Sequence, residues 1–404
     1  MRIGIEAQRL FRKAKHGMDI VVLELIRNLQ EIDSENEYVI FVKAGEDRSC
    51  IRETKNFKIV ELKKSPFPFW EQVALPLRAR REKCDVLHCT SNTAPIFSRI
   101  PSVLTLHDII YMEKLSLFQK SGTWYQRLGN MYRRFIVPLV VRKTGKIITV
   151  SNYEKERIRD FFKLNGENLA AVYNGVSEHF RQVHSEEDLS RIKSTYRLPD
   201  DYLFFLGNTH PKKNTKNVLK AFSTFHQSEV SDLYLVMPDF KEKALQDLLQ
   251  EIGNPGLRER IHLTGYIDNK DLPVIYSLSQ LFLYPSLRES FGIPILEAMA
   301  CGTPVITSNT SSMPEVAGDA ALLIDPSQPD QIADAINALV TIHSLRKKYV
   351  EMGLSRARSF NWKSMAEEVL EIYREMKGKI QTKVYENNDK ESGYSDHRAP
   401  ILGY

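Results

Sequence analysis

The stretch LYPSLRESFGIPILEAMACGTPVITSN, residues 283–309, has the pattern of a strand, a loop, a short helix and a second strand. Its apolar runs are short and continuous, which is typical of parallel strands that are covered on both faces. Pro294 fits the first turn of the helix, where a missing N–H costs nothing, and Gly302 fits its end. The stretch therefore predicts one unit of a parallel α/β sheet, with Glu289 on the loop and Glu297 on the helix.

The same alternation of strands and helices extends along the chain in two series. In the first series we expect strands at 2–7, 37–43, 57–62, 84–90, 102–108 and 145–150. In the second series we expect strands at 201–207, 233–237, 260–265, 281–285 and 304–309. Polar sequence at 181–199 joins the two series. This pattern predicts an α/β protein with two Rossmann-like domains, whose parallel sheets face each other across a cleft.

The composition fits a globular protein of two domains. The chain has 404 residues, 42% of them hydrophobic and 26% charged, and this length exceeds what one hydrophobic core usually supports. No apolar run reaches the ~18 residues that a membrane span needs, and the start of the chain lacks the pattern of a signal peptide. The four cysteines suit neither a disulfide framework nor a zinc site. We therefore expect a cytoplasmic enzyme with reduced cysteines.

The net charge of +5 is distributed unevenly along the chain. Residues 1–180 contain 30 Lys and Arg against 21 Asp and Glu, whereas the remainder contains 26 against 30. A basic first half favours an anionic partner, such as phosphate groups or a lipid surface. Uneven solvation of the two domains explains the difference equally well.

The loop at 286–292 and the start of the helix that follows it form a candidate ligand site. Sheets of this kind bind ligands beyond the carboxyl ends of their strands, and free N–H groups at a helix start suit an anion such as diphosphate. We expect Glu297 near that start, with Glu289 on the loop, and both carboxylates would accept hydrogen bonds from sugar hydroxyls. On their spacing alone, a solvated Glu289 and a Glu297 that interacts only with the helix dipole are equally good interpretations.

The stretch YPSLRESFGIPILEAMACGTPVITSNTSSMPEVAGDAALLIDP, residues 284–326, resembles the signature of retaining nucleotide-sugar glycosyltransferases of family 4, which have the GT-B fold. Their pattern is a Glu, seven residues and a second Glu, flanked by Phe-Gly, Pro, Glu-Ala and Gly-x-Pro-Val. The resemblance implies that Glu289 contacts the donor sugar and that Glu297 holds the ribose. It also implies donor contacts from the backbone N–H groups of Ser290, Phe291 and Gly292.

A second matching patch is FLGNTHPKKN, residues 205–214. The resemblance implies that Lys213 binds the donor diphosphate, as a compact cation should, and that Lys212 stands where Arg is common. Asn208 occupies a position where some members carry an Arg, which leaves Lys212 or a residue of the first domain for the second phosphate contact. Taken alone, the same residues are also typical of a solvated helix start.

In the first half, the resemblance implies three site residues. The loop QRLFRKAKHGMD at 8–19 contains Gly17, where members have one or two glycines that let the backbone approach the donor and the acceptor. His107 stands at a strand end, where the resemblance places a His beside the transferred sugar, with Asp108 as its orienter or as an acceptor contact. A lone His is otherwise more often structural. The missing three-glycine fingerprint argues against a dehydrogenase.

The resemblance covers residues 1–378 and implies which substrate each domain binds. The first domain would bind the acceptor, the second would bind the nucleotide sugar, and a final helix would cross back to the first. The polar C-terminal sequence predicts a flexible tail. We place these four parts at residues 1–182, 183–360, 361–378 and 379–404.

Residues 114–146 form a basic amphipathic segment with eight Lys and Arg and no acid. Apolar residues recur in it at helical spacing, which predicts a helix around 121–143. The helix either faces the core in the ordinary way or contacts a membrane surface or a lipid-diphosphate acceptor. The segment 66–83 is a second candidate of the same kind. The basic residues are Lys114, Lys120, Arg127, Arg133, Arg134, Arg142, Lys143 and Lys146.

The resemblance implies a hexosyltransferase that moves a hexose from a nucleoside diphosphate, such as GDP-mannose or a UDP-hexose, to a glycan or lipid-linked acceptor in lipopolysaccharide or capsule synthesis. It implies no cofactor and no obligatory metal, and the sequence has no Asp-x-Asp motif. We expect no nucleic-acid partner. The expected location is cytoplasmic, with contact at the inner face of the cytoplasmic membrane left open. The alternatives are a sugar epimerase of the same fold and an inactive glycan-binding subunit.

Overall fold

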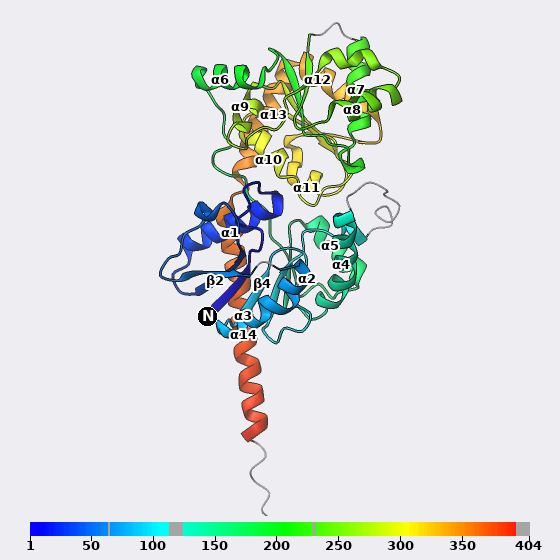
Figure 1. Ribbon diagram of the computed structural model, residues 1–404. Helices are drawn as coiled ribbons and strands as arrows, with labels where there is room; N and C mark the ends of the chain where they lie inside the picture. The colour runs from blue at the N-terminus through cyan, green and yellow to red at the C-terminus, as the bar shows by residue number, and fades with distance from the viewer. Residues whose placement is uncertain (64, 113–123, 229–231, 393–404) are drawn as a thin grey trace, which may run out of the picture.

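The computed structural model describes residues 1–63, 65–112, 124–228 and 232–392 of the chain. In these ranges the chain forms two lobes, and each lobe is a parallel sheet covered by helices (Figure 1). The first lobe contains the N-terminus, and the second contains most of the chain from residue 183 to residue 360. The predicted pair of Rossmann-like domains is confirmed.

The sheet of the first domain has the strand order β3-β2-β1-β4-β5-β6-β7, and the strand pairings are parallel. The order reverses between β1 and β4, which is where doubly wound sheets bind their ligands. Its strands are β1 (Arg2–Glu6), β2 (Glu37–Lys43), β3 (Phe57–Leu62), β4 (Val86–Cys89), β5 (Ser102–Thr105), β6 (Lys146–Thr149) and β7 (Leu169–Ala171). Its helices are α1 (Gly17–Ile32), α2 (Phe67–Phe69), α3 (Leu75–Arg81), α4 (Trp124–Val140) and α5 (Asn152–Phe162), and a π-helical turn, Trp70–Ala74, joins α2 to α3.

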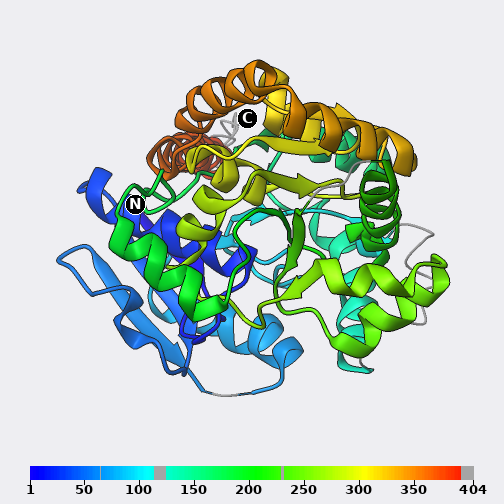
Figure 2. The same ribbon diagram turned by 90° about the horizontal axis from the view of Figure 1, so that it is seen from above.

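The sheet of the second domain has the order β10-β9-β8-β11-β12-β13 and is also parallel. Figure 2 looks down onto this domain, whose helices lie on both sides of the sheet. The strands are β8 (Tyr202–Phe205), β9 (Tyr234–Met237), β10 (Ile261–Leu263), β11 (Leu281–Tyr284), β12 (Val305–Ser308) and β13 (Leu322–Ile324). The helices are α6 (Glu186–Tyr196), α7 (Thr215–Ser228), α8 (Glu242–Glu251), α9 (Leu272–Leu278), α10 (Ile293–Ala300), α11 (Met313–Ala317), α12 (Pro329–Thr341) and α13 (His343–Arg358).

The strand order of the second sheet brings its two site loops together. β8 and β11 are neighbours at the point where the order reverses. The lysine-containing loop follows β8, and the Glu289 loop follows β11. Both strands are fully buried because helices cover both faces of the sheet, as their continuous apolar sequences predict.

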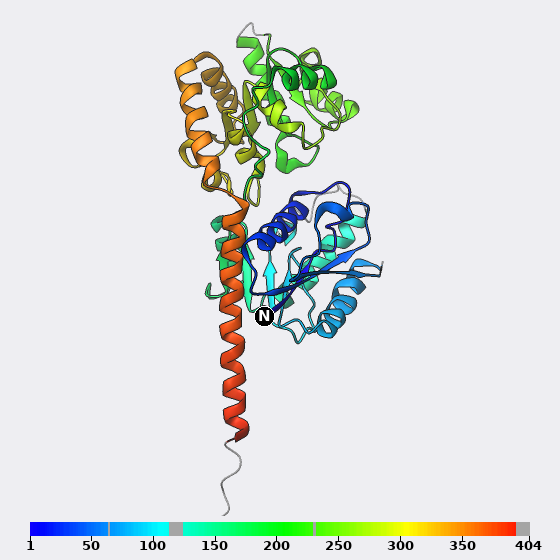
Figure 3. The same ribbon diagram turned by 90° about the vertical axis from the view of Figure 1, so that its left-hand side faces the viewer.

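The last helix, α14 (Trp362–Ser392), returns to the first domain and runs along its side (Figure 3). Its apolar face joins the core of that domain beside β1 and α1, with Trp362, Val369, Tyr373 and Met376 among the buried side chains. The chain approaches itself closely where the helix begins. A Cβ on Gly175 would lie 2.4 Å from the backbone nitrogen of Trp362, so this contact requires glycine.

The structure adds elements that the sequence analysis did not include, and it corrects the expected tail. The joining segment 181–199 contains α6, which has Ser185 as its N-cap and three acids in its first turn that favour the helix dipole. β7 and β13 are edge strands of three residues each. The structure continues α14 to Ser392, so residues 379–392 are helical, whereas residues 393–404 lie outside the described part.

Candidate functional site

A cavity of about 490 Å³ lies between the two domains and is lined by residues from both. Eight of the ten predicted site residues line it, and Lys213 and Glu297 do not. The eight are Gly17, His107, Asp108, Lys212, Glu289, Ser290, Phe291 and Gly292. A larger hollow of about 710 Å³ lies between the first domain and α14, and it has none of the predicted site residues in its lining.

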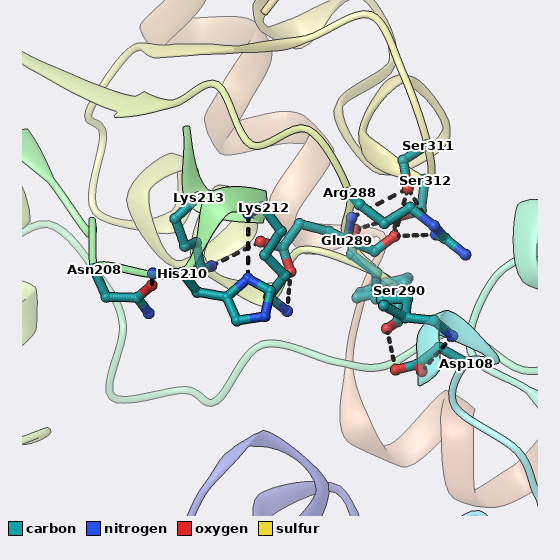
Figure 4. Close-up of polar contacts among 12 residues, drawn as sticks. Asp108, Asn208, His210, Lys212, Lys213, Arg288, Glu289, Ser290, Ser311 and Ser312 are labelled. Carbon is teal, nitrogen blue, oxygen red and sulfur yellow. Dashed lines mark hydrogen bonds and ion pairs between the residues drawn. The ribbon is translucent and has the colours of Figure 1, made fainter. Parts of the chain in front are cut away.

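Glu289 is buried on the loop between β11 and α10, beside two lysines (Figure 4). Its Oε1 accepts a hydrogen bond from Lys213 Nζ at 2.7 Å, and its Oε2 lies 3.7 Å from Lys212 Nζ. Burial by itself raises the pKa of Glu289, but the two ammonium charges outweigh burial and hold the pKa below its usual value. The carboxylate is therefore ionised at neutral pH. The interpretation of Glu289 as a solvated side chain is wrong, since only 8% of the residue is exposed.

The lysines occupy a short 3-10 turn, Pro211–Lys213, directly after β8. Leu287 N–H donates to the Lys212 carbonyl at 2.7 Å, which joins this turn to the Glu289 loop. Asn214 has a left-handed backbone, with a φ of 60°, and its side-chain amide donates to the carbonyl of Pro285 at 3.0 Å. These contacts hold the charged groups of two different loops in one place.

Glu297 lies in the second turn of α10 rather than at its start, so the expected position near the amino end is wrong. Its Oε2 accepts a hydrogen bond from Tyr276 OH at 3.2 Å. Burial raises the pKa of Glu297 to about 7, against the smaller opposite effect of this hydrogen bond. Glu289 and Glu297 are close in the sequence, separated by the end of one loop and one helical turn. Their pKa values nevertheless shift in opposite directions, so Glu297 is more protonated than Glu289 near neutral pH.

The amino end of α10 faces the cavity. Gly292, Ile293 and Pro294 at this end all line the cavity. Gly292 has a φ of 112°, a conformation that residues with a Cβ rarely adopt, and it forms the N-cap of the helix. Ser312 Oγ holds the loop before it by donating to the carbonyls of Glu289 at 3.0 Å and Phe291 at 2.8 Å.

In the first domain, His107 lies in the loop after β5, whose last residue is Thr105. Its backbone N–H donates to Asn92 Oδ1 at 2.7 Å, and its ring Nε2 donates to the Thr90 carbonyl at 3.1 Å. A carbonyl only accepts, so Nε2 carries the proton, and burial lowers the pKa of His107 so that the ring is neutral. His107 is among the residues that line the cavity.

Asp108 does not orient His107 through a hydrogen bond. Its Oδ1 accepts from the backbone N–H of Ile110 at 3.1 Å, and its Oδ2 accepts from Ser290 Oγ at 2.8 Å (Figure 4). Asp108 therefore connects the two domains, while Thr90 and Asn92 set the position of the histidine.

Gly17 begins α1 and lines the cavity, and a Cβ at this position would meet no atom within 4 Å. The glycine therefore leaves open space beside the site. Other residues that the sequence analysis did not assign to the site also line the cavity, and Asn92 among them carried a signal in its type, because Asn tolerates the left-handed φ of 68° that it adopts. Further polar examples are Asn130, Arg133, Asn174, His210 and Tyr284.

The described ranges contain neither a candidate membrane span nor a candidate metal centre. No helix in these ranges is long and apolar enough to cross a membrane. Nor do the described residues contain a group of three or more His, Cys, Asp or Glu side chains that could hold a metal ion. The expected independence of metal stays a prediction.

Two family models match the chain, one in each domain. The model of glycosyltransferase family 4 matches residues 16–180, and the model of glycosyl transferases group 1 matches residues 186–356. The chain belongs to the group 1 glycosyltransferases. The first model covers the domain with His107, and the second covers both the lysine turn and the Glu289 loop.

Named relatives of this glycosyltransferase chain include two proteins of Escherichia coli. The O-antigen chain mannosyltransferase B is 30% identical over 56% of this chain and 60% of its own length. The serotype-specific mannosyltransferase WbdA is 27% identical over 55% of this chain and only 28% of its own length. The matches thus span less than two thirds of the length of each of these relatives.

Among solved structures, the Anabaena protein HepE in complex with UDP and glucose is similar over 93% of this chain and 100% of HepE. The TM-score is 0.71 and the sequence identity is 17%, so the likeness concerns the fold. The predicted GT-B fold is confirmed.

Proposed function

We propose that this protein is a retaining hexosyltransferase that moves a hexose from a nucleoside diphosphate to a hydroxyl group of a glycan or lipid-linked acceptor. The observation that carries the proposal is the ion pair of Glu289 with Lys213, at 2.7 Å, beside a cavity that both domains line. A nucleotide sugar has an anionic diphosphate next to a ring of hydroxyl groups. A lysine next to an ionised carboxylate is complementary to both parts.

The donor would bind mainly to the second domain. Its diphosphate would meet Lys213, Lys212 and the N–H groups at the start of α10, while its sugar hydroxyls would donate to Glu289. Glu297 would accept hydrogen bonds from the ribose, and its ionised form would accept them most strongly. The names of the mannosyltransferase relatives favour a mannose donor such as GDP-mannose, whereas the UDP and glucose bound to HepE favour a UDP-hexose. We keep both donors in the proposal.

In the reaction, the bond between the sugar C1 and the diphosphate oxygen breaks, and the acceptor oxygen bonds to C1 on the same face. The bonding electrons leave with the diphosphate, whose growing negative charge Lys213, Lys212 and the helix N–H groups would stabilise. The acceptor proton passes to a phosphate oxygen of the leaving group. This route needs no protein nucleophile and no metal ion, and His107 would position the sugar from the opposite domain.

The acceptor would approach from the first domain, and we include contact with an anionic membrane surface in the proposal. On α4, Ile136, Val137 and Val140 face the core, as the ordinary interpretation of this helix predicts. Its other face carries apolar side chains in solvent, with exposed fractions from 39% to 71%, at the spacing of one helical stripe. These are Leu128, Met131, Phe135 and Leu139.

A second exposed apolar stripe, Phe69, Val73 and Leu77, lies on the adjoining segment from α2 to α3. The two segments pack together, since the Phe67 ring contacts the Tyr132 ring at 5.5 Å and Gln72 Nε2 donates to Tyr132 OH at 2.8 Å. Both segments also carry cations, namely Arg80 and Arg81 on α3 and Arg127 on α4. Apolar side chains among arginines are complementary to a bilayer with anionic head groups. Lys114 and Lys120 lie outside the described residues.

Glu289→Ala tests the proposed function. We expect the variant to lose transfer of the sugar while it still binds the nucleoside diphosphate, because the lysines and the helix start remain. A thermal-shift screen of nucleotide sugars on the wild type identifies the donor, and a turnover assay with that donor then compares the two proteins. Unchanged turnover in the variant would remove Glu289 from the mechanism, and a wild type that no nucleotide sugar stabilises would contradict the proposed donor class.

A further inference from the structure

The residue before Glu289 reaches into the other domain. Arg288 Nη1 lies 2.6 Å from Glu154 Oε1 on α5, and the Arg288 guanidinium lies 4.8 Å from the ring centre of Tyr153. The Arg288 side chain is 12% exposed and the Glu154 side chain is fully buried. A buried charge without its partner is costly, so each of these residues depends on the presence of the opposite domain.

The residue after Glu289 also contacts the first domain. Ser290 Oγ donates to Asp108 Oδ2 at 2.8 Å, and the Ser290 carbonyl accepts from Ser151 Oγ at 2.9 Å. Ser151 is the N-cap of α5, the helix that carries Glu154. The proposed sugar-binding carboxylate therefore stands between two residues that are both anchored on the opposite domain.

Glu315 on α11 fixes the same end of α5 from another direction. Its carboxylate accepts from the backbone N–H groups of Asn152 at 2.7 Å and Tyr153 at 2.9 Å, and from Tyr173 OH at 2.6 Å. These N–H groups belong to the first helical turn, where an anion is favoured. The second domain thus holds the first turn of α5 with one carboxylate and one guanidinium.

Arg288 also connects this interface to the backbone of the site. Its Nη1 donates to the Glu289 carbonyl at 3.0 Å and to Ser311 Oγ at 2.9 Å (Figure 4). Ser311 Oγ in turn donates to the same Glu289 carbonyl at 2.6 Å. One guanidinium therefore contacts both the buried Glu154 and the peptide group of Glu289.

We propose that Arg288 and Glu154 are positioning residues that set the backbone of Glu289 when the two domains dock. The inference rests on the proposed role of Glu289 and adds that docking of the two domains is coupled to the position of the Glu289 backbone. The contact between Glu289 and the donor sugar is completed only in the docked arrangement, because the guanidinium that holds the loop has its counter-charge on the other domain. Donor binding to the lysine turn does not depend on this contact, so binding and chemistry are separable.

Glu154→Gln tests the coupling with two measurements on the full chain. In turnover, we expect kcat to fall about tenfold or more while KM for the donor changes less than about twofold, since the variant disturbs positioning and not the phosphate contacts. In amide hydrogen exchange without substrate, we expect residues 287–291 to exchange at least about tenfold faster than in the wild type. The matched control is Arg258→Gln, which removes an exposed Arg–Glu pair on the second domain and should leave both measurements unchanged.

The double variant Arg288→Gln/Glu154→Gln leaves no uncompensated buried charge and serves if the single variant does not fold. We expect its kcat to be no lower than that of Glu154→Gln, because the two residues act as one unit. Unchanged exchange at 287–291 together with unchanged kcat would overturn the coupling, as would a rise in KM alone. If the wild type transfers no sugar, the proposed function fails, and the exchange measurement still decides whether the ion pair holds the loop.

Discussion

The two domains contribute different kinds of groups to the cavity between them. The second domain contributes charges in contact, with Glu289 ionised beside Lys212 and Lys213. The first domain contributes His107, which burial keeps neutral and two hydrogen bonds hold in place. Charge in the second domain suits a diphosphate, and a fixed neutral ring in the first suits the positioning of a sugar. Under the proposed function, the second domain would supply most of the binding energy, and both domains would set the geometry.

The largest expected effect is on the charged side. Lys213→Met removes the ammonium group nearest to Glu289, and we expect kcat to fall by roughly 100- to 1000-fold, as for the loss of one group that stabilises a leaving charge. Steady-state kinetics with the identified donor measures this. Lys216→Met is the control, because Lys216 forms an exposed pair with Glu251 on neighbouring helices and should change kcat by less than about twofold. A kcat for Lys213→Met near that of the control would show that the Lys213 charge does not stabilise the leaving group.

A smaller effect concerns two buried acids, Glu71 in the first domain and Glu297 in the second, since burial raises the pKa of each to about 7. An acid with a raised pKa binds more protons when folded, so the stability that it supports is lost as pH rises from about 4.5 to 7. We expect Glu71→Gln and Glu297→Gln each to remove roughly 1 to 3 kcal/mol of this pH dependence from the free energy of unfolding. Urea titrations at pH 5 and pH 8 measure it.

The two acids should differ in how they affect nucleotide binding. The ribose would donate to the ionised form of Glu297, so wild-type affinity for the nucleoside diphosphate should rise by roughly tenfold from pH 6 to pH 8. Titration calorimetry should show this rise in Glu71→Gln, because the wild-type Glu71 carboxyl group bonds to Thr93 and Tyr132 within the first domain. The rise should be absent in Glu297→Gln. The same pH dependence in all three proteins would show that Glu297 does not contact the nucleotide.

The smallest effect is expected on the outer surface of the first domain. Met131→Ser/Phe135→Ser should weaken binding to anionic phospholipid vesicles by roughly five- to tenfold, because less apolar area enters the interface. Turnover with a water-soluble acceptor should stay unchanged. Ile342→Ser, an exposed apolar side chain of the second domain, is the matched control for co-sedimentation with vesicles. Self-association of the wild type through this surface without vesicle binding would contradict the membrane proposal.

Most of the fold could be predicted from local pattern, because buried parallel strands of four or more residues leave continuous apolar runs. The runs at 281–285 and 304–309 are examples, and they appear as β11 and β12. The three-residue edge strands β7 and β13 were not identified, whereas the equally short edge strand β10 lies within the predicted run at 260–265. Helix α6 escaped notice because its sequence is mostly polar, although Ser185 and the following acids are the usual start of a helix.

The sequence by itself determined the groups of the second domain's site, since the lysine turn and the Glu289 loop each follow a buried strand and carry their own turn residues. Which of these groups are ionised follows from packing, because burial raises the pKa of both carboxylates and only Glu289 has two lysines beside it that outweigh this effect. The pairing of Arg288 with Glu154 also follows from the tertiary structure alone. These residues are far apart in the chain and lie on different domains, and a contact between side chains at such separation leaves no periodic trace in a single sequence.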